Sequence, residues 1–87
     1  MLKGKTESDF AFEVPDNRLS NIELIDELAA ADSGNLLAVS RALTMLLGAE
    51  QKKALYDHVR TEDGLVPTEK VMAELTQIMT SGQNAKN

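Results

Sequence analysis

The chain of 87 residues contains no cysteine and no tryptophan, and its only aromatic side chains are Phe10, Phe12 and Tyr56. Without cysteine, neither a disulfide framework nor a thiolate metal site can form. The longest apolar runs are about four residues, whereas a membrane-spanning helix needs about 20. No apolar stretch of the kind found in signal peptides follows the first lysines. We therefore expect a soluble, cytoplasmic protein.

Basic residues are also scarce. Nine lysines and arginines stand against 14 aspartates and glutamates, which gives a net charge of −5. The only local basic cluster is Lys52, Lys53 and Arg60, and Glu50 and Asp57 offset it. Nucleic-acid binding depends on clustered cations that neutralise phosphates. The charge balance therefore argues against a DNA-binding helix-turn-helix.

Alternating residues near the N-terminus predict a strand. Phe10, Phe12 and Val14 are separated by Ala11 and Glu13, which is the period of a half-buried strand. A lone strand leaves its backbone groups unpaired, so residues 2–6 are the expected partner. We expect an N-terminal β-hairpin within residues 1–15 that packs on helices.

Start and stop signals predict the helices. Ser20 and Glu23 have the spacing of a capping box, Gly48 suits a left-handed helix stop, and Pro67 suits a first helical position. We expect four helices, near residues 20–31, 35–47, 49–60 and 67–80. The predicted fold class is therefore mostly α: a small four-helix domain with an N-terminal β-hairpin. Residues 1–80 form the single domain, and residues 81–87 are expected to be a disordered polar tail.

Apolar residues at helical spacing predict which faces are buried. In the first helix the expected stripe is Ile22, Ile25, Leu28 and Ala29. In the second it is Leu36, Val39, Leu43, Leu46 and Leu47, and in the last Val71, Met72, Leu75, Ile78 and Met79. The leucines expected to be mostly buried are Leu43, Leu46, Leu47, Leu55 and Leu75.

No motif points to chemistry. Asp63-Gly64 resembles the middle of an EF-hand loop, but that alignment places Val59 at the first ligand position and Lys70 at the bidentate one. His58 is the only histidine; Asp57 beside it points elsewhere on a helix, and Glu62, four residues later, could share its face. One histidine and one carboxylate make neither a metal site nor a triad. The sequence predicts no catalytic residue, no metal ligand and no cofactor.

Several segments together resemble a known family. They are the hairpin, the capped acidic helix Ile22-Glu23-Leu24-Ile25-Asp26, then Leu46-Leu47-Gly48-Ala49-Glu50-Gln51, Asp57-His58-Val59-Arg60-Thr61-Glu62-Asp63-Gly64, and Val66-Pro67. Together they resemble small proteins encoded in the tail-morphogenesis modules of long-tailed bacteriophages and prophages, and above all the tail assembly chaperones. The resemblance covers roughly residues 8–80.

The resemblance implies a non-enzymatic protein that binds the phage tape measure protein and keeps it soluble during tail assembly. It implies a location in the bacterial cytoplasm, absence from the mature virion, and self-association. Nucleic acid, membrane and small-molecule substrates are not expected. The alternative is another small phage-encoded helical protein-binding module, a regulator, or a head or tail completion protein.

The thin core suggests where a partner binds. A domain this small buries only about 60–65% of its unfolded surface, so some apolar side chains remain uncovered. We expect a helical partner to contact the hairpin and the last helix. The predicted protein-binding residues are Phe10, Phe12, Met72, Ile78 and Met79.

The resemblance also bears on the C-terminus. Chaperones of this group are commonly made in two lengths, the longer through a −1 ribosomal slip near the end of the short frame. Ala85-Lys86-Asn87 can be written in codons that contain a run of adenines ending in C, which permits such a slip. Polar Lys/Asn tails are also common without it. The hypothesis is that residues 1–87 are the short form.

Overall fold

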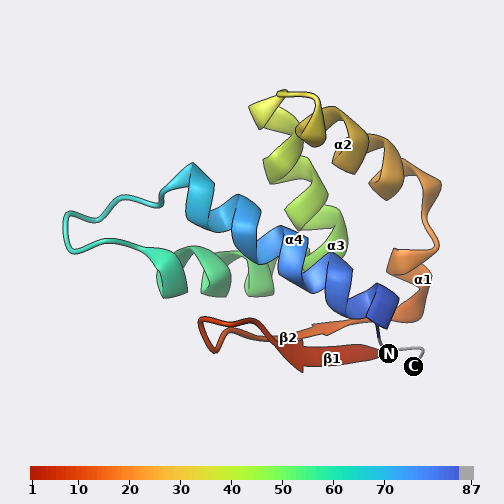
Figure 1. Cartoon of the computed structure of the whole chain (residues 1–87), viewed down its shortest axis with the longest axis horizontal. Coiled ribbons are helices and arrows are strands. Elements are labelled where there is room, and N and C mark those ends of the chain that lie inside the picture. Colours follow the sequence, from red (N-terminus) through yellow and green to blue (C-terminus); the bar gives the residue numbers. More distant parts are fainter. Residues whose placement is uncertain (85–87) are drawn as a thin grey trace.

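The structure, a computed structural model, describes the backbone of residues 1–84 and the side chains through Ser81. Its elements are, in order, β1 (Leu2–Lys5), β2 (Ala11–Val14), α1 (Asp16–Leu19), α2 (Ile22–Asp32), α3 (Leu36–Val59) and α4 (Thr68–Asn84). The hairpin lies along one side of the helices, and α4 crosses in front of α3 (Figure 1). The predicted fold class, a small mostly α domain with an N-terminal hairpin, is confirmed.

The predicted hairpin is present in an antiparallel register. Leu2 pairs with Val14, and Gly4 pairs with Phe12. The apolar side chains of both strands share the face that packs on the helices, while Glu13 stays exposed. The turn contains Asp9 at φ 69°, a left-handed conformation that aspartate tolerates better than most residues. One buried sheet face therefore fixes the register.

The start of α2 differs from the predicted capping box. Asn21, not Ser20, is the N-cap, and its Oδ1 accepts a hydrogen bond of 3.0 Å from the amide of Glu23. The hydroxyl of Ser20 donates to the carbonyl of Asn17 at 3.3 Å, because Ser20 ends α1. Helix α1, a single turn, was not predicted. Because Ser20 caps its C-terminus, Ser20 is not available as the N-cap of α2.

Gly48 bends α3 into two arms. Its φ of 80° and ψ of 166° lie outside the helical region, in a conformation that other residues rarely adopt. The guanidinium of Arg18, from α1, lies 3.2 Å from where a Cβ would stand, and it donates to the carbonyl of Leu46 at 3.3 Å. A cation therefore satisfies a carbonyl at the end of the first arm, as helix C-termini favour. The predicted stop at Gly48 is confirmed as a bend between two helical arms.

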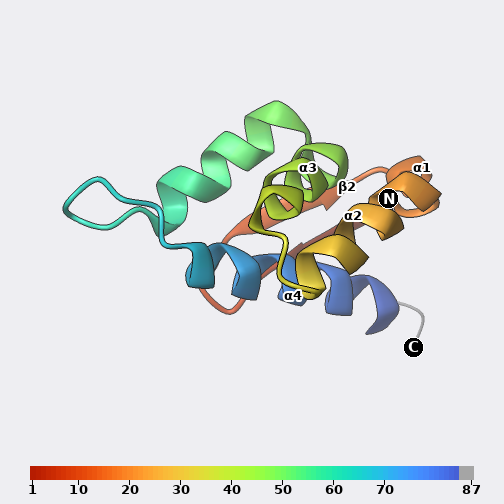
Figure 2. The ribbon, with the colours of Figure 1, turned by 90° about the horizontal axis from the view of Figure 1, so that it is seen from above.

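The second arm leads into an exposed loop and then α4 (Figure 2). Thr61 and Leu65 are joined by a backbone hydrogen bond of 2.8 Å, and Arg60 donates to the carbonyl of Gly64 at 2.9 Å. Pro67 stands directly before α4, and its carbonyl accepts from Val71. The predicted turn is thus present, and Pro67 lies within one residue of its expected place.

The expectation of a disordered tail from residue 81 is wrong for residues 81–84, where α4 continues to Asn84. The polar residues from Ser81 onward gave no apolar pattern from which this last turn could be predicted, because a helix shows an apolar face only where it packs. Residues 85–87, which carry the rest of that expectation and the possible slip codons, lie outside the described residues.

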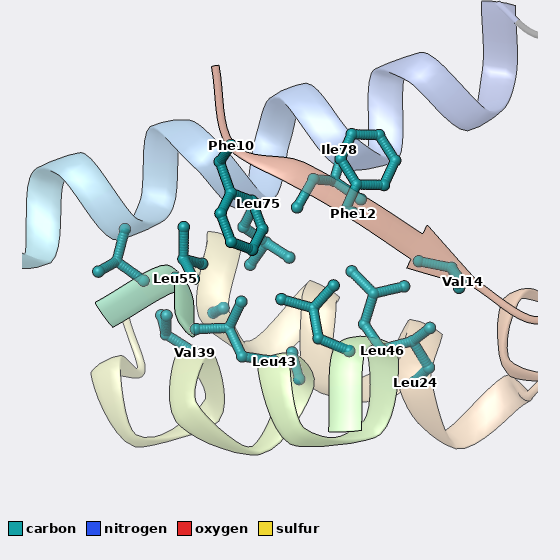
Figure 3. Packing of buried hydrophobic residues seen from close by; sticks show 14 of the residues in the cluster. Phe10, Phe12, Val14, Leu24, Val39, Leu43, Leu46, Leu55, Leu75 and Ile78 are labelled. Atoms are coloured by element: carbon teal, nitrogen blue, oxygen red, sulfur yellow. The ribbon is translucent and has the colours of Figure 1, made fainter. Parts of the chain in front are cut away.

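The core lies between the hairpin, α3 and α4, with α2 closing one end (Figure 3). Its fully buried side chains of largest volume are Leu24, Leu43, Leu46, Leu55, Ile78 and Val14. All five leucines predicted to be buried are buried, which confirms that assignment: Leu43, Leu46, Leu47, Leu55 and Leu75.

The buried face of α2 is not the predicted one. Leu24 and Ala31 are buried and Leu28 is partly buried, whereas Ile22 is 68% exposed and Ile25 44% exposed. The helix is rotated so that the i, i+4, i+7 set faces α3. The more apolar isoleucine pair is therefore left at the surface. The stripe predicted for this helix was wrong for Ile22, Ile25 and Ala29, and only Leu28 is partly buried.

The first turn of α3 departs from its prediction in the same way. Leu36 and Leu37 are both largely exposed, although Leu36 was expected on the core side. Burial along this helix begins with Ala38 and Val39. Small and β-branched side chains at those positions bring α3 close to its neighbours, and the two leucines lie beyond the contact.

Candidate protein-binding groove

The five predicted binding residues separate into two groups. Phe10, Phe12 and Ile78 are buried in the core, so the expectation that they offer a surface is wrong for the isolated domain. The hairpin and α4 cover one another at this point (Figure 3). Met72 and Met79 are only partly buried. They lie on another side of α4, where they border an open groove.

This groove, which we name the α2/α4 groove, has a volume of about 330 Å³. It is lined by Ile25, Leu28, Ala31, Asp32, Val39, Met72, Leu75, Thr76, Met79 and Thr80. Helices α2 and α4 each pack on α3, so α3 forms the floor and the other two helices form the walls. The lining is largely apolar, with two threonines and one carboxylate.

The α2 wall continues beyond the groove. Ile22 precedes Ile25 by three residues, and Ala29 follows Ile25 by four, so the three share one side of the helix. All three are exposed. An apolar stripe at helical spacing thus stands without a partner in the described part of the chain, which is uncommon for isoleucine. Sequence periodicity found this stripe but assigned it to the core.

A second hollow adjoins the first. It is lined by Leu36, Val39, Ser40, Tyr56, Arg60, Val66, Thr68 and Val71. Val39 borders both hollows, and the exposed Leu36 lies at the rim of the second. Apolar surface therefore extends from the α2/α4 groove toward the start of α4.

The charges around the groove are unevenly placed. Helix α2 carries Glu23, Asp26, Glu27 and Asp32 and no basic residue. Only Glu27 among these is paired in the described residues, with Arg41 at 2.9 Å. The α4 wall presents Thr76 and Thr80 instead of charges. Of the four α2 carboxylates only Asp32 lines the groove, so the α2 wall, which we call the acidic wall, carries one charge there and the α4 wall carries none.

A polar cluster joins the hairpin turn to α4 on the opposite side of the domain. Glu74 is only 4% exposed; its Oε1 accepts from the hydroxyl of Thr6 at 2.6 Å and its Oε2 accepts from that of Ser8 at 3.0 Å. Nε2 of His58 lies 2.8 Å from the carbonyl of Ser8 and 3.1 Å from its hydroxyl. We name these four residues the hairpin latch. Sequence reasoning missed it, because 68 residues separate Thr6 from Glu74.

The latch contains serine, histidine and glutamate but not the geometry of a catalytic triad. In a triad the acid orients the histidine, and the histidine accepts the serine proton. Here the carboxylate of Glu74 accepts the proton of Ser8 directly. A nitrogen of His58 that faces a carbonyl oxygen at 2.8 Å serves as a donor. The arrangement holds the turn in place and does not activate the Ser8 hydroxyl.

Other charged groups lie apart from the groove. The Arg60 guanidinium, hydrogen-bonded to Asp57 at 3.0 Å, and the Lys53 ammonium hold the pKa of that carboxyl below its usual range. Within residues 1–84, histidine and carboxylate side chains nowhere gather in threes as metal ligands do. The described helices include none whose length and apolar character would let it cross a membrane.

Comparisons with known proteins matched no protein-family model, no curated protein and no solved structure. The α2/α4 groove and the sequence resemblance are therefore the grounds on which a function can be argued.

Proposed function

We propose that the chain is a non-enzymatic phage tail assembly chaperone, which binds an apolar helical segment of the tape measure protein in the α2/α4 groove. The observation that carries the proposal is this open apolar groove, bordered by Ile25, Met72 and Met79. Met72 and Met79 belong to the face that the sequence assigns to a partner, and the resemblance to tail chaperones names the client.

The shape of the groove favours a helix as the bound element. Two helices wall an open trough over a third, and an amphipathic helix laid in such a trough buries its apolar face. A small-molecule site is a concave pocket that buries most of its ligand's surface, whereas this groove is open to solvent.

The composition of the walls fits a client that must be bound and then released. Methionine is unbranched and polarizable, so Met72 and Met79 can adapt to differing apolar side chains. Partly exposed anchors in an open groove give modest affinity, since binding must offset lost rotational and translational freedom. A chaperone that leaves its client during assembly requires that balance.

The test is co-expression with the tape measure protein encoded in the same tail module. The chain should raise the soluble fraction of that protein. The double variant Met72→Glu/Met79→Glu should remain folded by circular dichroism and leave the tape measure protein in the pellet. The milder Ile25→Gln, which adds no charge, should lower the soluble fraction partly.

A matched control adds the same two charges elsewhere. Ala54 and Leu65 are exposed and lie outside the groove, so Ala54→Glu/Leu65→Glu should solubilise the client as the unchanged chain does. If the unchanged chain leaves the client insoluble, the tape measure protein is not its client. If all variants solubilise it equally, binding does not use the groove.

A further inference from the structure

We propose that the helix bound in the α2/α4 groove carries lysine or arginine along the flank that faces α2, and uncharged residues along the flank that faces α4. The inference rests on the proposed function and adds to it the chemistry of the bound segment. Its basis is the difference in charge between the two walls.

The acidic wall follows from the positions of two carboxylates. Asp32 is seven residues after Ile25 and lines the groove beside it. Asp26 is four residues after Ile22, so it borders the exposed isoleucine stripe on its outer side. Within the described residues neither forms an ion pair, whereas Glu27, on the side facing α3, does. A helix bound in the groove would meet the free carboxylate of Asp32 directly. Asp26 lies outside the lining, where a side chain on the outer flank of that helix would have to reach over the isoleucine stripe.

The place of Asp32 is unfavourable for the domain alone. It is the last residue of α2, where the helix dipole favours a cation, and no basic residue stands in that turn. It makes no hydrogen bond among the side chains described. A partner cation beside Asp32 would remove this unfavourable interaction, so the position is better suited to a complex than to the free chain.

The α4 wall determines which residues suit the other flank of the bound helix. Between Met72 and Met79 the groove-lining polar residue is Thr76, and Thr80 follows one turn later. Neither carries charge, so nothing there compensates a buried cation on the partner. The nine residues from Met72 to Thr80 span about 12 Å, or about two turns of a bound helix. Apolar anchors at i, i+4 and i+7 would fit that length.

A second copy of the chain is a poorer occupant. Its exposed apolar residues on α2 lie beside Asp26 and Glu23, so docking that helix would bring carboxylates toward carboxylates. The net charge of −5 adds a general repulsion between copies. Charge complementarity therefore favours a basic partner.

Two synthetic peptides test the charge pattern. Both are helical and about 14 residues long, with leucine at i, i+4, i+7 and i+11; one has three lysines along one flank, and the other has glutamates there. Fluorescence anisotropy with the full chain should show the lysine peptide binding about three- to tenfold more tightly, because each exposed ion pair contributes modestly. The preference should shrink as salt is added.

Charge reversal on the protein locates the effect. Asp26→Lys/Asp32→Lys should abolish or reverse the preference for the lysine peptide. The control Glu62→Lys/Asp63→Lys makes the same charge change in the exposed loop and should retain most of it. Ile25→Gln should weaken both peptides equally, which shows that they occupy the groove.

Three results would overturn the inference. They are equal affinity for the two peptides, equal behaviour of the two charge-reversed variants, or a dimer in sedimentation velocity that dissociates when Ile25 is changed to glutamine. The first two results leave the co-expression result to stand or fall separately, since solubilisation of the tape measure protein depends on the groove and not on the sign of charge beside it. The dimer would place a second copy in the groove, and co-expression would then show whether the client displaces that copy.

Discussion

Helix α4 has two apolar sides, one covered by the hairpin and one bordering an open groove. Toward the hairpin, Ile78 is buried against Phe10 and Phe12, and the hairpin latch fixes the turn above them. Leu75 lies between the two sides, since it is buried and also lines the groove. Toward α2, Met72 and Met79 border a groove that nothing in the described chain fills. Both sides are apolar in sequence. What distinguishes them is a covering element that is attached by polar contacts on one side and missing on the other.

This contrast separates stability from binding within one small helix. The latched side contributes apolar burial and satisfied buried hydrogen bonds, which favour the folded state. The open side retains apolar area that only another molecule can bury. Substitutions on the two sides should therefore differ in kind. Three changes test that difference, and a fourth, at an exposed charge on α3 away from both sides, gives the scale of a small effect; they follow from the largest effect to the smallest.

The largest effect is expected from Phe12→Ala on the latched side. Phe12 is 2% exposed and its ring packs over Gly4, so truncation removes apolar contacts and leaves a cavity. We expect a loss of about 3–5 kcal/mol in the free energy of unfolding, measured by urea denaturation. A loss below about 1 kcal/mol would mean that the hairpin does not seal this side.

Loss of the latch charge comes next. Glu74→Gln keeps an acceptor for Thr6 but weakens two hydrogen bonds to a buried carboxylate and places an amide donor beside the Ser8 hydroxyl. We expect a loss of about 1–3 kcal/mol in the free energy of unfolding. Glu62→Gln, at an exposed position in the loop before α4, is the control and should be neutral. Equal changes in the free energy of unfolding for Glu74→Gln and its control would show that the latch does not stabilise the fold.

On the open side, Ile25→Gln should change the free energy of unfolding by no more than about 0.5 kcal/mol, because the side chain already contacts water. The same variant is expected to weaken partner binding. A stability loss comparable to that of Phe12→Ala would show that the groove wall belongs to the core, and the comparison between the two sides would collapse.

The smallest effect is expected from Asp57→Asn. The pKa of Asp57 is lowered by Arg60 and Lys53, so its ionised form stabilises the folded state at pH values above its ordinary pKa of 3.8. That contribution is lost as the pH falls through the lowered pKa. Because the group is exposed, the denaturation midpoints of the two proteins should differ slightly at neutral pH and converge in acid. Divergence in acid would contradict the assignment.

The sequence predicted the parts of the fold that depend on local pattern. Alternation located the hairpin strands, Gly48 located the bend in α3, and the spacing of Leu43 and Leu46 identified the core helix. Each of these features is decided within a few residues. Backbone conformation at a glycine and the period of an apolar stripe do not require knowledge of distant neighbours.

What the sequence could not predict depends on rotation and on distant contacts. Helix α2 offers two overlapping apolar stripes, one through Leu24 and one through Ile25, and only packing against α3 selects the first. The latch joins Thr6 to Glu74 across most of the chain. The sequence therefore identified only part of the groove lining: it predicted that the methionines bind a partner, and it wrongly assigned the isoleucines of α2 to the core.

The loop over residues 61–66 also has a consequence for chain connectivity. Its bonds are local, between Thr61 and Leu65 and between Arg60 and Gly64, and Leu65 points into solvent. Exposed, self-contained loop tips accept insertions and new termini most readily. The polypeptide should thus tolerate being lengthened or reopened at this point, which would provide a place for a tag or a fluorophore that leaves both sides of α4 as they are.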